Sequence, residues 1–581
     1  MGQANGRSAV EDIKRASRYL RGTIRASLAD PLTGGVPEAD RQLLKFHGTY
    51  LQDDRDLRLE RQRQKLEPAY QFMVRVRIPG GVLTAEQWLA LDDLAGRYGD
   101  GSLRLTTRQG VQFHGVVKWH LADTIRAIHT ALLTTLGACG DVNRNVTATA
   151  NPFRSPVHAA VHDWARRVAA HLTPQTAAYH EIWLDGTNLV PPPASEEEPF
   201  YGPTYLPRKF KIAFAVPPVN DVDVFAQDLG FIAVADGDRL VGFDVAVGGG
   251  MGMTYGDRTT YPQLARVIGF CRPEAVVPVA EQVVAIQRDY GNRAERNHAR
   301  LKYTIDARGL DWFVAELASR LGCRLKPARP VRFTHSGDRF GWEEGPDGRG
   351  HLTLRVESGR VRDGPDRPLR TGLRAVVEAH GGPVCLTPNQ NVVLAAVDPA
   401  RRARLEALAR AYGLLADGSP TRAQALACVG LPTCGLAMAE SERALPEWVS
   451  RIEAEQARVG WGAVPLAVRV SGCPNGCSRP YLAEVGLTGR APGRYDLYLG
   501  GDAAGTRLAQ PYGENLDAEG VLAILRPLFA RYVDQRRPGE RFGDFLCRVG
   551  IVRSVTDGRT FWAGGLPTPA ADGGTDKEVG R

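Results

Sequence analysis

The stretch GSLRLTTRQGVQFHGV at residues 101–116 returns in altered form as GPVCLTPNQNVVLAAV at residues 382–397. The two stretches share Leu-Thr-x-x-Gln in register, and each alternates apolar residues with others as a β-strand does. A match of this length within one chain predicts an internal repeat if the neighbouring segments match as well.

The neighbouring segments do match. QFMVRVRIPGGVL (71–83) and HLTLRVESGRV (351–361) both have the alternation of a strand. TAEQWLALDDLAGRYG (84–99) and LRTGLRAVVEAHGG (369–382) both have apolar residues at helical spacing, and Thr84 is a suitable N-terminal cap. The shared order of strand, helix and strand predicts two copies of one β-α-β module.

Further pieces repeat after each module. GFDVAVGGGMGMTYGDR (242–258) resembles RYDLYLGGDAAGTRLAQ (494–510), and GDVNRNVTATANP (140–152) holds the place that ALACVGLPTCG (425–435) holds in the second copy. We therefore expect an α+β fold with a pseudo-twofold internal repeat. The first copy is rich in Arg, Lys and His at the matched positions, whereas the second carries cysteines. A twofold arrangement would bring these basic residues and the cysteines together at one central site.

The composition fits a multidomain cytoplasmic protein. The chain has 581 residues, 43% hydrophobic and 24% charged, and a net charge of +8 carried mainly by arginine. It has no apolar run long enough to span a membrane, and its N-terminus lacks a signal-peptide pattern. It also lacks a phosphate-binding loop and a dinucleotide fingerprint, so electrons from a nicotinamide would have to arrive from another chain.

Four of the nine cysteines form two close pairs, Cys428 with Cys434 and Cys473 with Cys477. In a reducing compartment such pairs hold metal more often than they form disulfides. Four thiolates suit zinc or a [4Fe–4S] cluster, and the wide spacing, with Gly and Pro in the turns, favours the cluster without excluding zinc. The single cysteines are predicted to be small core residues: Cys139, Cys271, Cys323, Cys385 and Cys547.

Together, the cysteine segments, LRLTTRQGVQFHGV, DVNRNVTATANP and LPRKFKIAF resemble the sulfite and nitrite reductase family, which uses siroheme and a [4Fe–4S] cluster. The likeness runs from KFHGTYLQDDRDLR to RFGDFLCRVGIV and is greatest to the hemoprotein (beta) components of assimilatory sulfite reductases. It implies six-electron reduction of sulfite to sulfide. It also implies that Cys428, Cys434, Cys473 and Cys477 hold the cluster and that Cys477 is shared with the siroheme iron.

The resemblance further assigns the basic residues of the first copy. Arg75, Arg144, Lys209 and Lys211 match the family's substrate-anion residues. If residues 209–211 form a strand, both lysines face the same side, and an ammonium can donate a proton where a guanidinium effectively cannot. The alternative for an arginine on a strand is that it lies on a solvent-exposed face of the sheet and has no role in the site.

Siroheme carries eight carboxylates, so its pocket should be lined with cations and amides. Arg104, Arg108, Gln112 and His114 have the even spacing of one strand and are predicted to face it. Weaker candidates for the pocket are Arg77, Arg208, Arg300, Lys302 and Gln390.

The resemblance implies three domains that contain two ferredoxin-like halves. The expected bounds are 1–72 for an N-terminal extension, 73–137 for half 1, 138–340 for the siroheme and substrate repeat 1, 341–413 for half 2, 414–565 for the iron–sulfur repeat 2 and 566–581 for a disordered tail.

Two other functions stay open. A nitrite reductase of the same fold would use the same centres, although FHGTYLQDDRDLR and LPRKFK favour sulfite. A nucleic-acid-binding protein with a structural metal is suggested by the pI of 9.0, but the distinctive arginines lie beside apolar neighbours in strands. As partners we expect sulfite and an NADPH-dependent flavoprotein rather than a ferredoxin, with no specific nucleic acid and no membrane.

Overall fold

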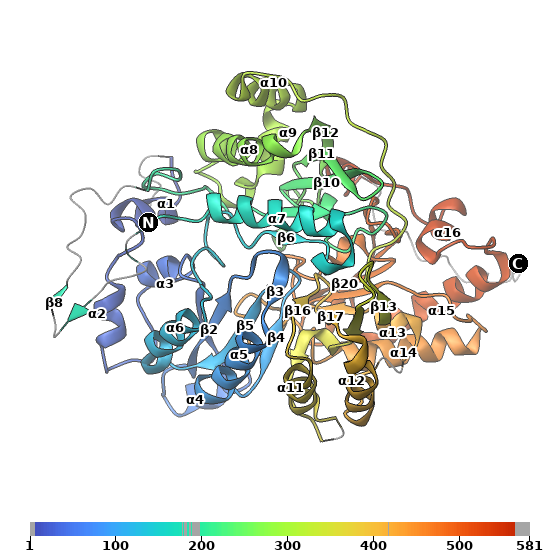
Figure 1. Cartoon of the computed structure of the whole chain (residues 1–581), viewed down its shortest axis with the longest axis horizontal. Helices are drawn as coiled ribbons and strands as arrows, with labels where there is room; N and C mark the ends of the chain where they lie inside the picture. Colours follow the sequence, from blue (N-terminus) through green and yellow to red (C-terminus); the bar gives the residue numbers. More distant parts are fainter. Residues whose placement is uncertain are drawn as a thin grey trace, which may run out of the picture.

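The computed structural model describes residues 6–563 except 177, 179–182, 185–186, 189–197, 366 and 416–417. This part contains four five-stranded sheets and a separate two-stranded ribbon, and helices lie against the larger sheets (Figure 1). The predicted tail at 566–581 lies outside the described residues.

The first half-module forms an antiparallel sheet in the order β1-β2-β5-β4-β15. Its strands and helices, in chain order, are β1 (Thr49–Asp53), β2 (Tyr70–Val76), β3 (Val82–Leu83), α5 (Ala85–Tyr98), β4 (Leu103–Leu105), β5 (Val111–Val116) and α6 (Leu121–Thr130). Thr84 caps α5 as predicted, since its side chain accepts from the Gln87 N–H and Gln87 bonds back to Thr84 in a capping box.

The second half-module repeats this topology in the antiparallel order β13-β14-β17-β16-β3. Its elements are β13 (Gly341–Glu344), β14 (Gly350–Leu354), β15 (Arg360–Val361), α11 (Leu369–His380), β16 (Val384–Leu386), β17 (Val392–Val397) and α12 (Pro399–Ala411). Helices α5, α6, α11 and α12 lie side by side along the lower edge of the molecule in Figure 1.

The two halves are joined by a reciprocal strand exchange. The short strand β3 of the first half pairs with β16, and β15 of the second half pairs with β4, so each half completes the sheet of the other. One hydrophobic core continues through both halves, from Trp88 on α5 to Leu373 on α11. Without this exchange, each half-module would leave one edge of its sheet unpaired.

The third and fourth sheets also share one topology, in the orders β12-β11-β10-β9-β6 and β22-β21-β20-β19-β18. In each, the first three strands along the chain are parallel and the last two antiparallel. The strands are β6 (Thr147–Ala148), β9 (Ile212–Ala215), β10 (Leu229–Asp236), β11 (Arg239–Val247), β12 (Arg266–Cys271), β18 (Leu426–Ala427), β19 (Val468–Ser471), β20 (Val485–Ala491), β21 (Arg494–Leu499) and β22 (Gln510–Leu516).

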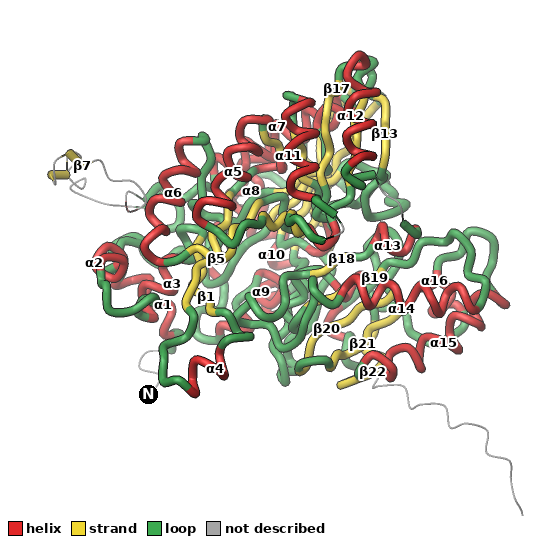
Figure 2. Tube along the Cα trace, turned by 90° about the horizontal axis from the view of Figure 1, so that it is seen from below, coloured by secondary structure: helices red, strands yellow, loops and turns green. Residues whose placement is uncertain are grey.

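Helices occupy matching places around these two sheets. A helix follows the first strand and another follows the fifth: α7 (Pro156–His171) and α8 (Val276–Tyr290) in the first copy, α14 (Leu445–Arg458) and α15 (Ala518–Gln535) in the second. Figure 2 shows α14 and α15 beside β20, β21 and β22. The α+β fold with a pseudo-twofold internal repeat is therefore confirmed.

The remaining elements surround this framework. They are α1 (Ala9–Ala16), α2 (Ile24–Ala29), α3 (Glu38–Leu44), α4 (Arg58–Arg63), the ribbon β7 (Trp183–Leu184) and β8 (Thr187–Asn188), α9 (Leu301–Arg308), α10 (Leu310–Leu321), α13 (Pro420–Gln424) and α16 (Phe542–Arg548). Among the described residues, no helix has the length and apolar character needed to cross a membrane.

Candidate active site

The two cysteine pairs meet in one place. Cys428 and Cys434 lie in the loop after β18, and Cys473 and Cys477 lie in the loop after β19, the neighbouring parallel strand. Burial, and then the charge of Cys477, raise the pKa of Cys428 and that of Cys473 to about 12. Burial, and then Cys477, also raise the pKa of Cys434. A thiolate makes it harder for neighbouring thiols to lose their protons. A positively charged metal centre is therefore needed to hold all four cysteines as thiolates.

Polar groups are already directed at these sulfurs. The Gly472 N–H donates to Cys428 Sγ at 3.2 Å, and the Asn475 side-chain amide lies 3.6 Å from Cys473 Sγ. Among the described residues, no three His, Cys, Asp or Glu side chains are placed to hold one metal ion. A cubane takes one thiolate at each of four separate irons, and four thiols from two neighbouring loops supply that donor set.

Cys477 also lies beside the basic residues of the first copy. It interacts electrostatically with Arg75, Lys209 and Lys211, and at each of them it favours the charged form against the opposing effect of burial. The thiol of Cys477 is exposed, whereas Cys473 is buried. Cys477 is therefore an electrostatic neighbour both of the other three cysteines and of these cations.

The two lysines have strongly altered proton affinities. Burial, then the charges of Arg208 and Arg300, lower the pKa of Lys209 to about 7. Burial and Lys209 lower the pKa of Lys211 well below its usual value. Both therefore release a proton far more readily than an ordinary lysine. Strand β9 itself begins at Ile212, but Phe210 between the lysines is buried and forms an isolated parallel bridge with Asn143, so strand pairing extends to the centre of this segment.

Arg75, on β2, is held in place by neighbouring side chains. With its amide oxygen turned toward the guanidinium, Gln112 accepts from Arg75 Nε at 3.1 Å. Arg75 Nη1 lies 2.8 Å from Cys139 Sγ. Tyr50 on β1 bonds to Arg144 and interacts with Arg75. Arg75 and Arg144 thus share one group of contacts, and Cys139, which we predicted as a plain core residue, is buried in that group.

The prediction that Arg104, Arg108, Gln112 and His114 share one strand is wrong. β4 ends at Leu105 and β5 begins at Val111, with a tight turn between them. Thr106 closes the turn by accepting from the N–H groups of Arg108 and Gly110. Even spacing through a hairpin cannot be told from even spacing along a strand by alternation alone.

The hairpin still places several of these residues in one row. Arg104 pairs with Gln112 across β4 and β5, and Gln112 pairs with Arg75 across β5 and β2. Arg104 is only 2% exposed, and it bonds to Glu442 at 2.5 Å and to the Ala427 carbonyl, next to Cys428, at 2.9 Å. In these contacts Arg104 fastens the cysteine loop to the first copy.

The other predicted pocket residues divide into those bound to protein and those with unused polar atoms. Arg300 forms a two-point ion pair with buried Asp228 at 2.7 and 3.0 Å. Lys302 donates to the carbonyls of Gly250, Gly252 and Tyr261. Arg77 donates to the Ala169 carbonyl within α7 and to the Thr173 hydroxyl just after that helix. These contacts favour a structural role for Arg77.

Unused polar atoms are the strongest sign of a missing anionic group. In the described chain, both ring nitrogens of His114, Arg108 Nε and Gln390 Oε1 are buried without a partner. Such groups are costly unless a ligand satisfies them. Burial and the neighbouring cations Arg360 and Arg104 lower the pKa of His114 well below its usual value, and burial likewise lowers that of Arg208. A large polyanion such as siroheme fits this set.

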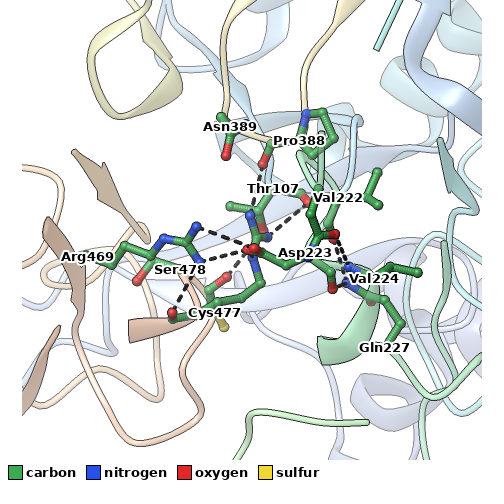
Figure 3. A network of polar contacts seen from close by, with 12 residues as sticks. Thr107, Val222, Asp223, Val224, Gln227, Pro388, Asn389, Arg469, Cys477 and Ser478 are labelled. Carbon is green, nitrogen blue, oxygen red and sulfur yellow. Dashed lines mark hydrogen bonds and ion pairs between the residues drawn. The ribbon is translucent and has the colours of Figure 1, made fainter. Parts of the chain in front are cut away.

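Sequence reasoning missed the residues that brace the cysteine loop. Asp223 binds both Arg469 and Arg479, at 2.7 Å to Arg469. Figure 3 shows Asp223 and Arg469 beside Cys477 and Ser478. Arg55 donates to the Ala437 carbonyl in the other cysteine loop. Arg479 stands two residues after Cys477, and that proximity was the signal in the sequence.

Comparison with known proteins shows the class. The model described as "Nitrite/Sulfite reductase ferredoxin-like half domain" matches residues 63–131 and 343–412, the two half-modules. The model described as "Nitrite and sulphite reductase 4Fe-4S domain" matches residues 163–325 of the first copy, whereas the cysteines lie in the second. The chain belongs to the nitrite and sulfite reductase family.

Within that family the chain is similar to proteins named "Sulfite reductase [NADPH] hemoprotein beta-component". The protein of Anoxybacillus flavithermus is 58% identical, over 95% of this chain and 97% of the relative. That of Myxococcus xanthus is 57% identical, over 94% of this chain and 97% of the relative. Among solved structures, the NirA protein of Mycobacterium tuberculosis has the same fold, with a TM-score of 0.73 and 24% identity, covering 93% of this chain and 96% of its own.

Proposed function

We propose that this protein is the hemoprotein component of an assimilatory sulfite reductase, which reduces sulfite to sulfide with six electrons. One observation carries the proposal: Cys477 is close to three other cysteines and also to arginines and lysines contributed by the other copy of the repeat. The similarity to sulfite reductase hemoproteins supports sulfite over nitrite.

In this proposal each copy has a separate task. Cys428, Cys434, Cys473 and Cys477 hold the [4Fe–4S] cluster, and Cys477 is shared with siroheme. His114, Arg108, Gln390 and their neighbours bind the siroheme periphery. When bound, these groups supply the electrons and the iron that takes the substrate.

The chain's own cations complete the chemistry. Arg75 and Arg144 hold the sulfite dianion and keep its oxygens in place as their bonds lengthen. Each departing oxygen must leave as water, so protons have to arrive at the oxygens. Lys209, whose pKa is lowered to about 7 before cofactors bind, and Lys211 are the proton donors. An anionic siroheme would raise both pKa values and keep the ammonium forms charged.

The electrons come from a second chain. Since the sequence has no dinucleotide or flavin fingerprint, we propose an NADPH-dependent flavoprotein as the donor, in line with the word NADPH in the names of the similar proteins. Such a pair would operate in the cytoplasm.

The test starts with the protein purified from a host able to make siroheme. A chlorin-like visible spectrum, about five irons per chain and acid-labile sulfide are expected. Reduced methyl viologen should then drive sulfide release from sulfite faster than ammonia release from nitrite. A colourless or zinc-containing protein would refute the proposal, and faster turnover of nitrite would reassign the substrate.

A further inference from the structure

Where the elements of the two copies match, residues of one copy have equivalents in the other. The 3-10 helix η5 (Val224–Ala226) begins twelve residues after the start of β9, and η9 (Pro480–Leu482) begins twelve residues after the start of β19. Asp223 and Arg479 immediately precede these helices and are therefore equivalent. Both have left-handed backbones, with φ of 47° and 58°. Non-glycine residues hold such conformations where the surroundings fix them, often at functional sites.

These two equivalent residues bind each other across the copies. The Asp223 carboxylate accepts from Arg479 Nε and, at 2.7 Å, from Arg469 Nη1. Asp223 is fully buried, and Arg469 and Arg479 are only 4% and 6% exposed. One carboxylate thus faces two buried guanidinium groups and leaves one positive charge in excess.

The arginines continue the network to the cysteine loop. Arg479 donates to the Thr107 and Pro388 carbonyls, which lie in the β4–β5 and β16–β17 turns of the two half-modules, at 3.4 Å each. Thr107 Oγ1 in turn donates to the carbonyl of Cys477 at 3.2 Å. Figure 3 shows Thr107, Pro388, Arg469 and Cys477 gathered around Asp223. The backbone at Cys477 is therefore held from both copies through one carboxylate.

Asp223 is also connected by hydrogen bonds to the predicted siroheme pocket. Gln227 Nε2 donates to the carbonyl of Asp223 at 3.2 Å, while Gln227 Oε1 accepts from Arg108 Nη1 at 2.9 Å. One chain of contacts hence runs from Arg108, through Gln227 and Asp223, to the loop of the shared cysteine.

We infer that Asp223 is a positioning residue, which through Arg469 and Arg479 fixes Cys477 between the two metal centres and adjusts the charge next to its thiolate. The inference rests on the proposed function, because it takes Cys477 as the shared ligand. Residues that orient a ligand in this indirect way typically change affinity or activity by about 10–100-fold when replaced.

The test is Asp223→Asn in the full-length holoprotein, with all values expressed per bound siroheme. We expect partial loss of the magnetic coupling between siroheme and cluster in Mössbauer and EPR spectra. The midpoint potential of the cluster should shift to more positive values, because a negative charge is removed. The viologen-driven kcat for sulfite should fall about tenfold, while the KM for sulfite stays within about twofold because the anion-binding residues are untouched.

Glu455→Gln is the matched control, since Glu455 is another buried carboxylate shared by two arginines, Arg458 and Arg526, outside the cysteine loops. It should leave coupling, potential and kcat per siroheme unchanged. Asp223→Asn with wild-type coupling, potential and kcat would overturn the inference.

If Asp223→Asn does not fold, two other variants replace it in the test. Thr107→Val removes the hydroxyl that binds the Cys477 carbonyl, and Arg469→Lys removes a guanidinium that binds Asp223. Wild-type spectra and potential in both would likewise overturn the inference. Absence of siroheme–cluster coupling in the wild-type protein would instead refute the proposed function.

Discussion

The first and second copies have sheets of one topology but contribute to the site from opposite ends of their parallel strands. In the first copy Arg144 precedes β6, and Lys209 and Lys211 precede β9. In the second copy Cys428 follows β18 and Cys473 follows β19. The equivalents of Lys209 and Lys211 are Pro465 and Ala467, and those of Cys473 and Cys477 are Pro217 and Asp221.

This difference teaches how a duplicated fold can carry an asymmetric site. Both copies have the same framework, but the predicted substrate lysines precede a strand in the first copy and the predicted cluster cysteines follow strands in the second. The reciprocal strand exchange between the two half-modules belongs to the framework. The cations and the thiols belong to one copy each, and substitutions should separate these two kinds of residue.

The largest effect is expected for Cys477→Ser in the second copy. A serine hydroxyl is a far weaker ligand for iron than a thiolate, so the link between the two centres should be lost together with sulfite reduction. Iron, acid-labile sulfide and siroheme contents, with EPR spectra, measure this. Cys385→Ser, a change to a buried cysteine outside the four, is the control and should keep both centres. Retention of both centres with normal turnover in Cys477→Ser would contradict the assignment.

Removal of a first-copy cation should leave the metal centres in place but slow the reaction. Lys209→Ala or Lys211→Ala should reduce sulfite turnover by about 10²–10⁴-fold, as for other lost general acids, with a nearly unchanged visible spectrum. The control is Lys118→Ala, a buried lysine that binds the Ser27 and Asp30 carbonyls instead. Steady-state kinetics with reduced methyl viologen decide, and unchanged rates in both site variants would remove the lysines from the mechanism.

The lowered pKa of Lys209 gives a prediction for the siroheme-free protein. Between pH 7 and the usual lysine value of 10.5, the unfolded chain binds a proton there that the folded chain, with a pKa of about 7, does not. The free energy of unfolding should therefore rise with pH across this window. Urea unfolding at several pH values should show a smaller rise in Lys209→Met than in the wild type. An identical pH dependence would mean that Lys209 has an ordinary pKa.

The framework could be predicted from the sequence far better than the site. Repeated alternation and the helix cap at Thr84 are local signals, and they correctly predicted the modules and α5. The turn between β4 and β5 and the contacts of Cys139 depend on residues far apart in the chain, so alternation alone missed them. Of the single cysteines, Cys323 is exposed rather than in a core, because it follows the end of α10. The roles of the basic residues and the domain bounds stay predictions.

The smallest effects should come from a pair of residues that the repeat makes equivalent. Gln109 Nε2 donates to the Leu386 carbonyl at 3.0 Å, and Gln390 Nε2 donates to the equivalent Leu105 carbonyl at 3.4 Å. Only Gln109 also accepts, from the Ala148 N–H at 2.9 Å, whereas Gln390 Oε1 is buried without a partner in the described chain. The first copy therefore uses its glutamine fully for structure, and the second leaves an acceptor unused.

In the siroheme-free protein, Gln109→Ala should lower the free energy of unfolding by about 1–3 kcal/mol, since it leaves a buried N–H and a buried carbonyl unpaired. Gln390→Ala should cost less, about 0.5–1.5 kcal/mol, because one longer bond is lost and one unsatisfied oxygen is removed. Denaturant unfolding measures both. With siroheme bound, Gln390→Ala should also lower siroheme retention during dialysis, while Gln109→Ala should not. The opposite outcome is that the two variants lose the same free energy of unfolding in the siroheme-free protein and retain siroheme equally well. That result would show that the two glutamines have equivalent roles and that the copies do not differ at these turns.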